Sequence, residues 1–170
     1  MTEPTTYDLF RAARRSAVHL ETRDAYTPTD PDWLEWEAGG RFNPAERWRD
    51  WFELMRETTG RGVCVRRARI VSEPISDYIR FEHDVTNDHN IAAGEQVRWL
   101  PRHRATDLLI SPVDHWVFDD SIIVFNHFDG VGDWVGEERR DDADLAQLLA
   151  TSFDALWERA TPHAEYLIDR

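Results

Sequence analysis

The sequence contains no lysine, because all 20 of its basic residues are arginines. This absence excludes mechanisms that need a lysine amine: a Schiff base, the lysine of a phosphate-binding P-loop and the nucleotide-binding lysine of protein kinases. Arginine can still form paired hydrogen bonds to carboxylates and phosphates. The basic side chains therefore indicate ion pairing or anion recognition.

Cysteine and long apolar runs are also scarce. The single cysteine, Cys64, excludes an internal disulfide, and its position between two valines predicts a small buried side chain. No apolar run approaches the roughly 18 residues of a membrane-spanning helix. The first residues lack the basic start and apolar stretch of a secretory signal. We therefore expect a soluble, cytoplasmic protein that does not contact a membrane.

Acidic residues outnumber basic ones by 33 to 20, which gives a net charge of −13. Phosphate contacts need a cationic surface, so direct nucleic-acid binding is disfavoured. A basic partner or a small anion in a local pocket remains compatible with this charge. The length of 170 residues, with 41% hydrophobic residues and eight tryptophans, predicts a single domain over residues 1–170.

Apolar periodicity divides the chain into helices and strands. The spacing predicts a helix over 6–20, a short helical turn from residue 33 and a helix over 43–60 that begins at Asn43 and Pro44. Strands are predicted over 63–71 and 95–101, with a helical connection between them. Three antiparallel strands over 115–142 follow, with turns near 119–120 and 130–132. A helix capped by Asp141 or Asp142 and a short helix after Pro162 complete the chain.

These elements predict an α+β fold. A helical segment (6–60) packs on a mixed sheet (62–140), and helices follow over 141–170. The strand–helix–strand unit requires parallel pairing, and antiparallel strands follow it. A three-layer α/β/α sandwich is the more specific form of this prediction.

Arginines lie inside both strands of the predicted parallel unit. Alternation places Arg67 and Arg69 on one face of their strand and Arg66 on the other, while Arg98 lies in the second strand. Because a buried guanidinium needs a partner, the first interpretation is a set of structural ion pairs. The alternative is an anion pocket at the ends of the parallel strands, where Arg69 would converge with Arg80, Arg98 and Arg102.

Both interpretations concern the same group of residues, which contains arginines together with acidic and aromatic residues near them. The candidate ligand or partner pocket consists of Arg69, Glu73, Tyr78, Arg80, Glu82, Arg98, Arg102, Asp119 and Asp120. We predict no catalytic residue, metal or cofactor. The spacings of His83, His89, His115 and His127 match no zinc site, which favours surface positions for these histidines. No G-x-S-x-G motif is present to supply a serine nucleophile.

Tryptophans occur in two pairs spaced three residues apart, Trp33 with Trp36 and Trp48 with Trp51. This spacing puts the members of each pair on one helix face. Core packing is the first interpretation, and an exposed aromatic stripe that binds a protein is the alternative.

Three segments carry a resemblance to a known family: IVSEPISDYIRFE (70–82), NIAAGEQVRWLPR (90–102) and DHWVFDD (114–120). The sequence resembles an uncharacterised family of small proteins from GC-rich, actinomycete-type bacteria, and the resemblance covers nearly the whole chain. His115 departs from it, because the family pattern has phenylalanine there. The motif residues map to Ser72, Glu73, Tyr78, Arg80, Phe81, Glu82, Asn90, Gly94, Glu95, Arg98, Arg102, Trp116, Phe118, Asp119 and Asp120.

The resemblance implies a domain of unknown function encoded beside helix-turn-helix regulators, and hence a protein partner and a regulatory role. The strand order is also similar to one half of a phospholipase D-like fold. The phospholipase D signature His-x-Lys-x4-Asp cannot occur in a chain without lysine. The likeness therefore implies a non-catalytic relative.

Three functions follow from these observations. The first is a non-catalytic regulatory or ligand-sensing module that acts with a protein partner, expected to be a helix-turn-helix regulator. The second is a small enzyme acting on an anionic metabolite, with Arg80, Arg98 and Arg102 as anchors and Glu82 or Asp120 as acid–base groups. The third is a structural role for the motif residues. We rank the regulatory function first.

Overall fold

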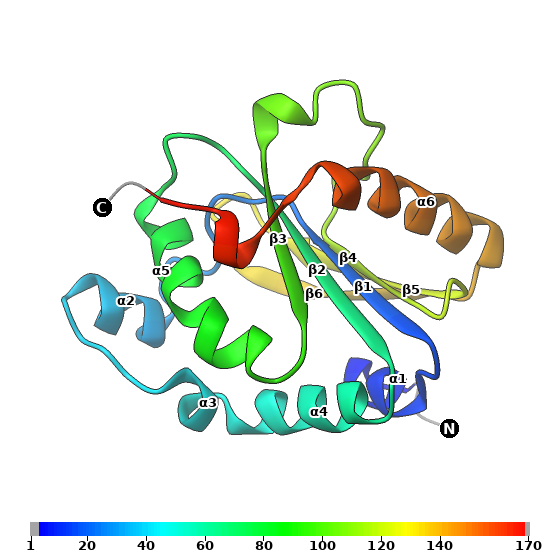
Figure 1. The fold of residues 1–170 in the computed structure, drawn as a ribbon, viewed down its shortest axis with the longest axis horizontal. Helices are drawn as coiled ribbons and strands as arrows, with labels where there is room; N and C mark the ends of the chain where they lie inside the picture. The colour runs from blue at the N-terminus through cyan, green and yellow to red at the C-terminus, as the bar shows by residue number, and fades with distance from the viewer. Residues whose placement is uncertain (1–3, 169–170) are drawn as a thin grey trace.

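The computed structural model describes residues 4–168, which form a mixed sheet of seven strands with helices on both faces (Figure 1). The strands are β1 (Ser16–Glu21), β2 (Cys64–Val71), β3 (Gln96–Pro101), β4 (His115–Phe118), β5 (Ile122–Phe128), β6 (Trp134–Arg140) and β7 (Thr161–Pro162). Their order across the sheet is β6-β5-β4-β1-β2-β3-β7. Strand β1 therefore lies in the middle of the sheet.

The sheet contains one parallel group of three strands, and its other pairings are antiparallel. Strands β1, β2 and β3 are parallel, whereas β4, β5, β6 and β7 each pair antiparallel with their neighbours. The predicted α+β class and the parallel β2–β3 unit are confirmed. The predicted hairpin turn at Asp119-Asp120 is confirmed as well, and both residues have positive φ.

The helices are α1 (Thr6–Ala12), α2 (Pro31–Glu37), α3 (Pro44–Arg47), α4 (Arg49–Gly60), α5 (Asp77–Thr86), the π-helix η1 (Asn87–Ile91), the 3₁₀ turns η2 (Arg102–Arg104) and η3 (His163–Glu165), and α6 (Ala143–Arg159). Side-chain caps begin the helices α1, α2, α3, α5 and α6. Asn43 caps α3 and Asp142 caps α6, as predicted. The predicted helix over 43–60 is divided at Trp48, where the backbone leaves the helical conformation.

Apolar side chains form a layer of core on each face of the sheet. Helix α6 packs on one face, where Leu156 and Phe153 meet Leu20 and Ile70. Helices α1 and α4 cover the other face, where Phe10 and Met55 meet Val65. The chain therefore has the three-layer α/β/α arrangement (Figure 1).

The predicted helix over residues 6–20 is wrong in its second half. Helix α1 ends at Ala12, and residues 16–21 form the central strand β1. Five of its six residues are buried, because both of its faces are covered. A strand of this kind usually reads as a continuous apolar run. Here His19 and Glu21 interrupt the run. Ala13, Ala17 and Leu20 have helical spacing, and for this reason the predicted helix was extended into the strand.

Two predictions about single residues are also wrong. Cys64 is exposed instead of buried, because it is the first residue of β2 and lies beside the exposed Gln96 at the end of the sheet. His89 and His115 are buried instead of exposed. His89 lies in the π-helix, and His115 bonds through Nδ1 to the carbonyl oxygen of Val113.

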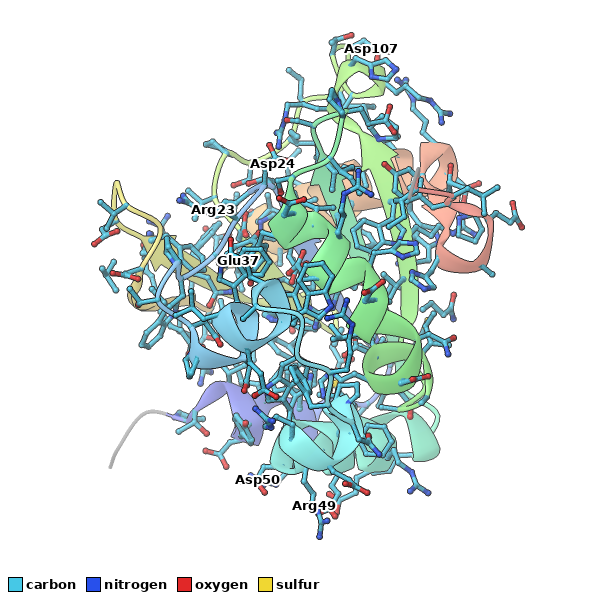
Figure 2. All side chains as sticks on the ribbon, turned by 90° about the vertical axis from the view of Figure 1, so that its left-hand side faces the viewer. Arg23, Asp24, Glu37, Arg49, Asp50 and Asp107 are labelled. Carbon is cyan, nitrogen blue, oxygen red and sulfur yellow. The ribbon has the colours of Figure 1, made fainter. Side chains whose placement is uncertain are left out.

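Charged side chains surround the layers. Figure 2 shows Asp50 of α4 and Asp107 of the loop after η2 at opposite ends of the molecule. Within residues 4–168, no helix has the length and apolar content needed to cross a membrane.

Candidate functional site

The register of the two central strands creates a polar cluster on the face covered by α1 and α4. His19 of β1 is the register partner of Arg67 of β2, and Glu21 is the partner of Arg69. Side chains alternate between the faces of a strand, so all four lie on one face. All four are buried. Charged residues at the centre of a sheet are stable only when paired, so their partners define the site.

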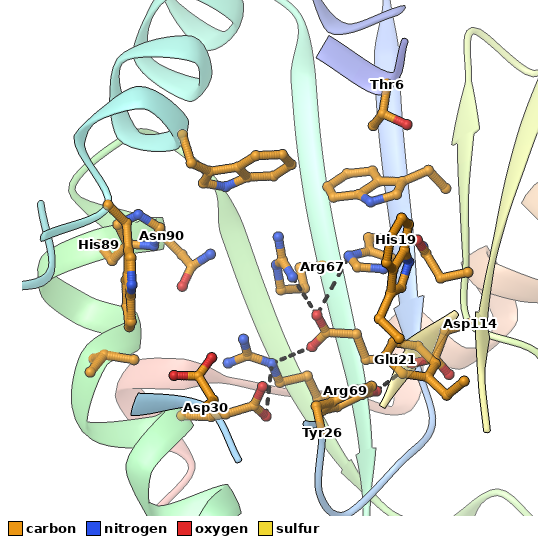
Figure 3. Close-up of a pocket in the computed structure, with 18 of the residues that line it drawn as sticks. Thr6, His19, Glu21, Tyr26, Asp30, Arg67, Arg69, His89, Asn90 and Asp114 are labelled. Carbon is orange, nitrogen blue, oxygen red and sulfur yellow. Dashed lines mark hydrogen bonds and ion pairs between the residues drawn. The ribbon is translucent and has the colours of Figure 1, made fainter. Parts of the chain in front are cut away.

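Glu21 binds both arginines at once. Arg67 donates from Nη1 to Glu21 Oε1, and Arg69 donates from Nε to Glu21 Oε2. Arg67 also donates from Nε to Oε2 of Glu95 over 2.9 Å, and Arg69 donates from Nη1 to Oγ1 of Thr86 over 2.7 Å. Figure 3 shows Glu21 between the two guanidiniums. Both arginines are therefore neutralised by carboxylates of the chain.

Helix α5 and the π-helix η1 bring more buried polar groups to the same face. Glu82 of α5 lies 3.5 Å from Arg69, measured from Oε2 to Nε. Asn90 of η1 donates from Nδ2 to Oε2 of Glu95 over 3.2 Å. The neighbouring His89 lies with Asn90 on the side of the site opposite His19 (Figure 3). π-Helical turns are uncommon and occur frequently at functional sites.

These groups surround a cavity of about 550 Å³. Drug-sized ligands occupy cavities of roughly 300–1,000 Å³ with apolar walls and a few converging polar groups. The lining comes from the N-terminal segment, the helices and the sheet: Thr5, Thr6, Tyr7, His19, Glu21, Tyr26, Asp30, Trp48, Trp51, Arg67, Arg69, Tyr78, Phe81, Glu82, Val85, His89, Asn90, Asp114, Trp116, Asn126, Phe128, Trp134 and Glu137.

Burial sets the protonation of the cavity's acids and bases. It raises the pKa of Glu82 to about 7, although the charge of Arg69 opposes this rise. Burial also acts on Glu21, but the guanidiniums of Arg69 and Arg67 outweigh it and leave the pKa of that carboxyl far below its usual range. Burial holds the pKa of His19 well below its usual value, so the imidazole is neutral at pH 7. Two glutamates that share one arginine thus have opposite shifts.

Three buried polar atoms in the cavity wall have no hydrogen-bond partner: Nδ1 of His19, Oε2 of Glu82 and Nε2 of His89. His19 Nδ1 lies 3.5 Å from Glu21, and Glu82 Oε2 lies 3.5 Å from Arg69, but neither contact is a hydrogen bond. An unsatisfied buried polar group costs about 1–3 kcal/mol. Three such atoms in one wall indicate a place for a polar ligand.

Carboxyl groups exceed guanidinium groups in the wall. Glu21, Asp30, Glu82, Asp114 and Glu137 line the cavity, against two arginines. Asp114 is satisfied by hydrogen bonds from Tyr26 and Thr22, and burial raises its pKa. The cavity is therefore acidic, and an anionic ligand would meet unfavourable charge.

The sequence-predicted pocket residues do not converge at one site. Only Arg69, Tyr78 and Glu82 line the cavity. The predicted convergence of Arg69 with Arg98 is wrong, because Arg98 lies on the face covered by α6. There it packs over the ring of Trp157, 4.5 Å from its centroid, and donates to the Trp157 carbonyl oxygen.

The two other arginines of the predicted anion pocket have local partners. Arg102 donates to the Thr22 carbonyl oxygen and to Ser72 Oγ. Arg80 pairs with Asp77 one helical turn earlier on α5, 3.7 Å away. The structural ion pairs expected for the strand arginines are present at Arg67 and Arg69, which pair with Glu21, Glu82 and Glu95.

The remaining predicted residues stabilise turns and connections. Glu73 accepts a hydrogen bond from the Tyr166 hydroxyl over 2.8 Å. Asp119 accepts bonds from the backbone N–H groups of 14–16, and Asp120 lies 3.8 Å from Arg15. These contacts hold the β4–β5 turn against the entry to β1.

Sequence reasoning did not select several residues of the site, among them His19, Glu21 and Asp114, and it named Glu95 only as a family motif residue. One signal was available. His19 and Glu21 alternate with buried Val18 and Leu20, as polar and apolar residues do in a strand. The family motif residues Phe81, Asn90 and Trp116 also line the cavity, so all three resembling segments contribute to it.

Comparison with known proteins places the chain in a family. The chain belongs to the family of the domain of unknown function DUF6879, whose model matches residues 4–168. The resemblance to an uncharacterised family is thereby confirmed. No curated protein sequence matches the chain.

Solved structures support the fold. Nuc, a phospholipase D family member from Salmonella typhimurium, has a TM-score of 0.52 at 12% identity, over 92% of this chain and 86% of its own. TrmBL2, described as an archaeal chromatin protein with a novel mode of DNA binding, has a TM-score of 0.51 at 11% identity. That match covers 91% of this chain and 47% of TrmBL2. The predicted likeness to a phospholipase D-like fold is confirmed, and at these identities it concerns the fold alone.

Proposed function

We propose that the protein is a non-catalytic ligand-sensing module that acts with a protein partner. The observation that carries this proposal is the cavity of about 550 Å³, whose wall contains buried charged groups and three polar atoms without a hydrogen-bond partner. A ligand that satisfied those atoms would stabilise the folded state that holds it.

The construction of the cavity favours sensing. Its wall joins the sheet to α1, α4, α5 and the β5–β6 hairpin, so a bound ligand would contact separate elements at once. A ligand with different affinity for two arrangements of those elements shifts their populations. Burial raises the pKa of the Tyr26 and Tyr78 hydroxyls, so neither is a nucleophile at neutral pH.

An exposed apolar surface beside the cavity supports a protein partner. Val131, Trp134 and Val135 are 70%, 54% and 61% exposed, and they lie in and beside the β5–β6 turn. Trp134 also lines the cavity, so this surface is continuous with the ligand site. Clustered exposed apolar side chains mark interaction surfaces. The family resemblance makes a helix-turn-helix regulator the partner to test first.

The ligand proposal is tested by thermal unfolding of the protein against a chemically diverse metabolite library. A ligand at one hundred times its Kd stabilises the folded state by about 2.7 kcal/mol, or about 5–10 °C for a chain of this size. Val85→Trp fills the cavity and should abolish every such shift, because Val85 lines it. Leu148→Trp on the exposed side of α6 is the matched control and should retain the shifts. A library without hits would refute ligand sensing.

The partner proposal is tested by affinity purification from the native host with mass spectrometry of retained proteins. A stoichiometric helix-turn-helix regulator is expected. It should be lost with Val131→Ser/Val135→Ser and kept with Leu148→Ser, which removes an equally exposed apolar side chain on another surface. Retention of the same regulator by all three proteins would refute the assigned surface.

A small enzyme acting on a metabolite is the second candidate function, and Glu82 favours it. A carboxyl with a pKa of about 7 beside a cavity suits general acid–base catalysis. The acidic wall disfavours the anionic substrate expected from the sequence. Mass spectrometry of library compounds before and after incubation tests this candidate, and turnover that disappears in Glu82→Gln would replace the sensing proposal.

A further inference from the structure

The chemistry of the unpartnered cavity atoms specifies the ligand that would satisfy them. Glu82 Oε2 is a carboxylate oxygen at 9% residue exposure, and in its ionised form it can only accept hydrogen bonds. It needs a donor from the ligand. Arg69 does not supply this bond: its Nε donates to Glu21, its Nη1 donates to Thr86, and its 3.5 Å contact with Glu82 is not a hydrogen bond.

His89 presents a second acceptor. Burial lowers the pKa of the imidazole, so the ring is neutral at pH 7, although interaction with the Trp48 backbone favours a ring proton. Because Nε2 has no partner, we assign that proton to Nδ1. Nε2 therefore carries a lone pair and requires a donor as well.

The surrounding charge favours a cation. Five carboxyl side chains and two guanidiniums line the cavity, and both guanidiniums are already paired with carboxylates. A neutral donor would leave the excess negative charge uncompensated. An anion would add to that charge and would find no unpaired guanidinium among the lining residues.

Aromatic faces complete the wall. Trp48, Trp51 and Phe81 line the cavity together with Tyr78. The electron-rich face of an aromatic ring attracts ammonium and guanidinium groups, most strongly when water is excluded. The same rings bury the apolar body of an organic ligand.

We infer that the cavity binds an organic cation, an amine, amidine or guanidine with an apolar body, whose N–H groups donate to Glu82 Oε2 and His89 Nε2 among the aromatic rings. This inference rests on the proposed ligand-sensing function and specifies its ligand class. It assigns Glu82 and His89 as recognition residues.

Matched sets of compounds test the inference by isothermal titration at pH 8. Each set keeps the ring and changes the charge: tryptamine, tryptophol and indole-3-propionate, and benzamidine, benzamide and benzoate. The cation of at least one set should bind, and its neutral and anionic counterparts should bind at least about tenfold more weakly. Val85→Trp should abolish the binding, because it fills the cavity.

Two variants assign the recognition atoms. Glu82→Gln and His89→Phe should each weaken binding of the cation by about tenfold to a hundredfold. Glu82→Gln removes the negative charge and replaces one acceptor oxygen with an NH2 group at constant size, and His89→Phe removes the ring nitrogens and keeps an aromatic ring. Glu53→Gln on the exposed side of α4 is the control and should bind as the unaltered protein does. If a variant does not fold, the charge selectivity of the unaltered protein still decides the inference.

The contrary outcomes are distinct. Equal or tighter binding of a neutral or anionic counterpart would overturn the cation inference and leave ligand sensing intact. If neither tryptamine nor benzamidine bound while library compounds of other classes did, the cation inference would likewise be overturned and ligand sensing would stand. If neither the cations nor the library stabilised the protein, both proposals would fail. Cation binding that Val85→Trp left unchanged would remove the cavity as the site.

Discussion

Replacing Glu82 with glutamine tests the electrostatics of the cavity directly. Burial raises the pKa of Glu82 from 4.5 to about 7 in the folded protein. The folded state therefore binds more protons than the unfolded state between these values, and the contribution of Glu82 to stability falls as pH rises through this window. Below pH 4.5 both states are protonated, and above pH 7 both are ionised.

The size of this effect follows from the shift. One pKa unit corresponds to 1.36 kcal/mol, so the shift corresponds to about 3 kcal/mol of stability that disappears between pH 4.5 and 8. Glutamine cannot ionise. The difference in unfolding free energy between Glu82→Gln and the unaltered protein should therefore move by about 2–3 kcal/mol in favour of the variant across this range.

Urea unfolding at intervals from pH 5 to pH 8 measures the effect in both proteins. Glu21→Gln provides a contrast of opposite sign, because the arginine charges lower the pKa of Glu21. The stability from Glu21 is present above pH 4.5 and is lost as pH falls, so this variant should be destabilised at neutral pH. A free-energy difference for Glu82→Gln that stayed constant from pH 5 to 8 would refute the buried, cavity-facing environment assigned to Glu82.

Three further predictions concern the arginines and the ligand. Arg67→Met should cost about 3–5 kcal/mol in urea unfolding, because it leaves Glu21 and Glu95 buried without their shared partner; a cost below about 1 kcal/mol would contradict that pairing. Arg98→Ala should cost only about 1–2 kcal/mol and leave library binding unchanged, since this arginine lies on the other face of the sheet; lost binding would contradict the assigned site. Tryptamine affinity should rise about tenfold per pH unit below pH 7 as Glu82 ionises and level off above it, and a pH-independent affinity by titration calorimetry would count against Glu82 as the acceptor.

Elements with one strong periodicity were predictable from the sequence. Helices α4 and α6 bury one stripe, and strands β2 and β3 alternate between faces as expected. The caps Asn43 of α3 and Asp142 of α6 were also predictable, because each side chain bonds to backbone N–H groups two or three residues away. Local signals of this kind do not depend on the rest of the fold.

The predictions that were wrong concern residues whose roles depend on partners distant in the sequence. Arg98 is the third residue of β3 and Arg102 directly follows the strand, yet Arg102 bonds to the β1–α2 connection and Arg98 packs on α6. Asp119 looked like a pocket acid and instead accepts three backbone N–H bonds from the segment before β1. Sequence distance does not reveal which face or loop supplies such a partner.

The missed strand and the missed site have one cause. Strand β1 was predicted as part of a helix because it contains His19 and Glu21, whereas a central strand is expected to be apolar on both faces. These two residues are polar because their register partners in β2 are Arg67 and Arg69, and a buried guanidinium requires a carboxylate close by. Arg67 and Arg69 can therefore lie inside β2 because Glu21 of the neighbouring strand β1 accepts hydrogen bonds from both arginines. An apolar pair of strands at these positions would fill this part of the sheet with packed side chains. The charged pairs instead form one wall of a cavity in which three polar atoms, on His19, Glu82 and His89, lack partners.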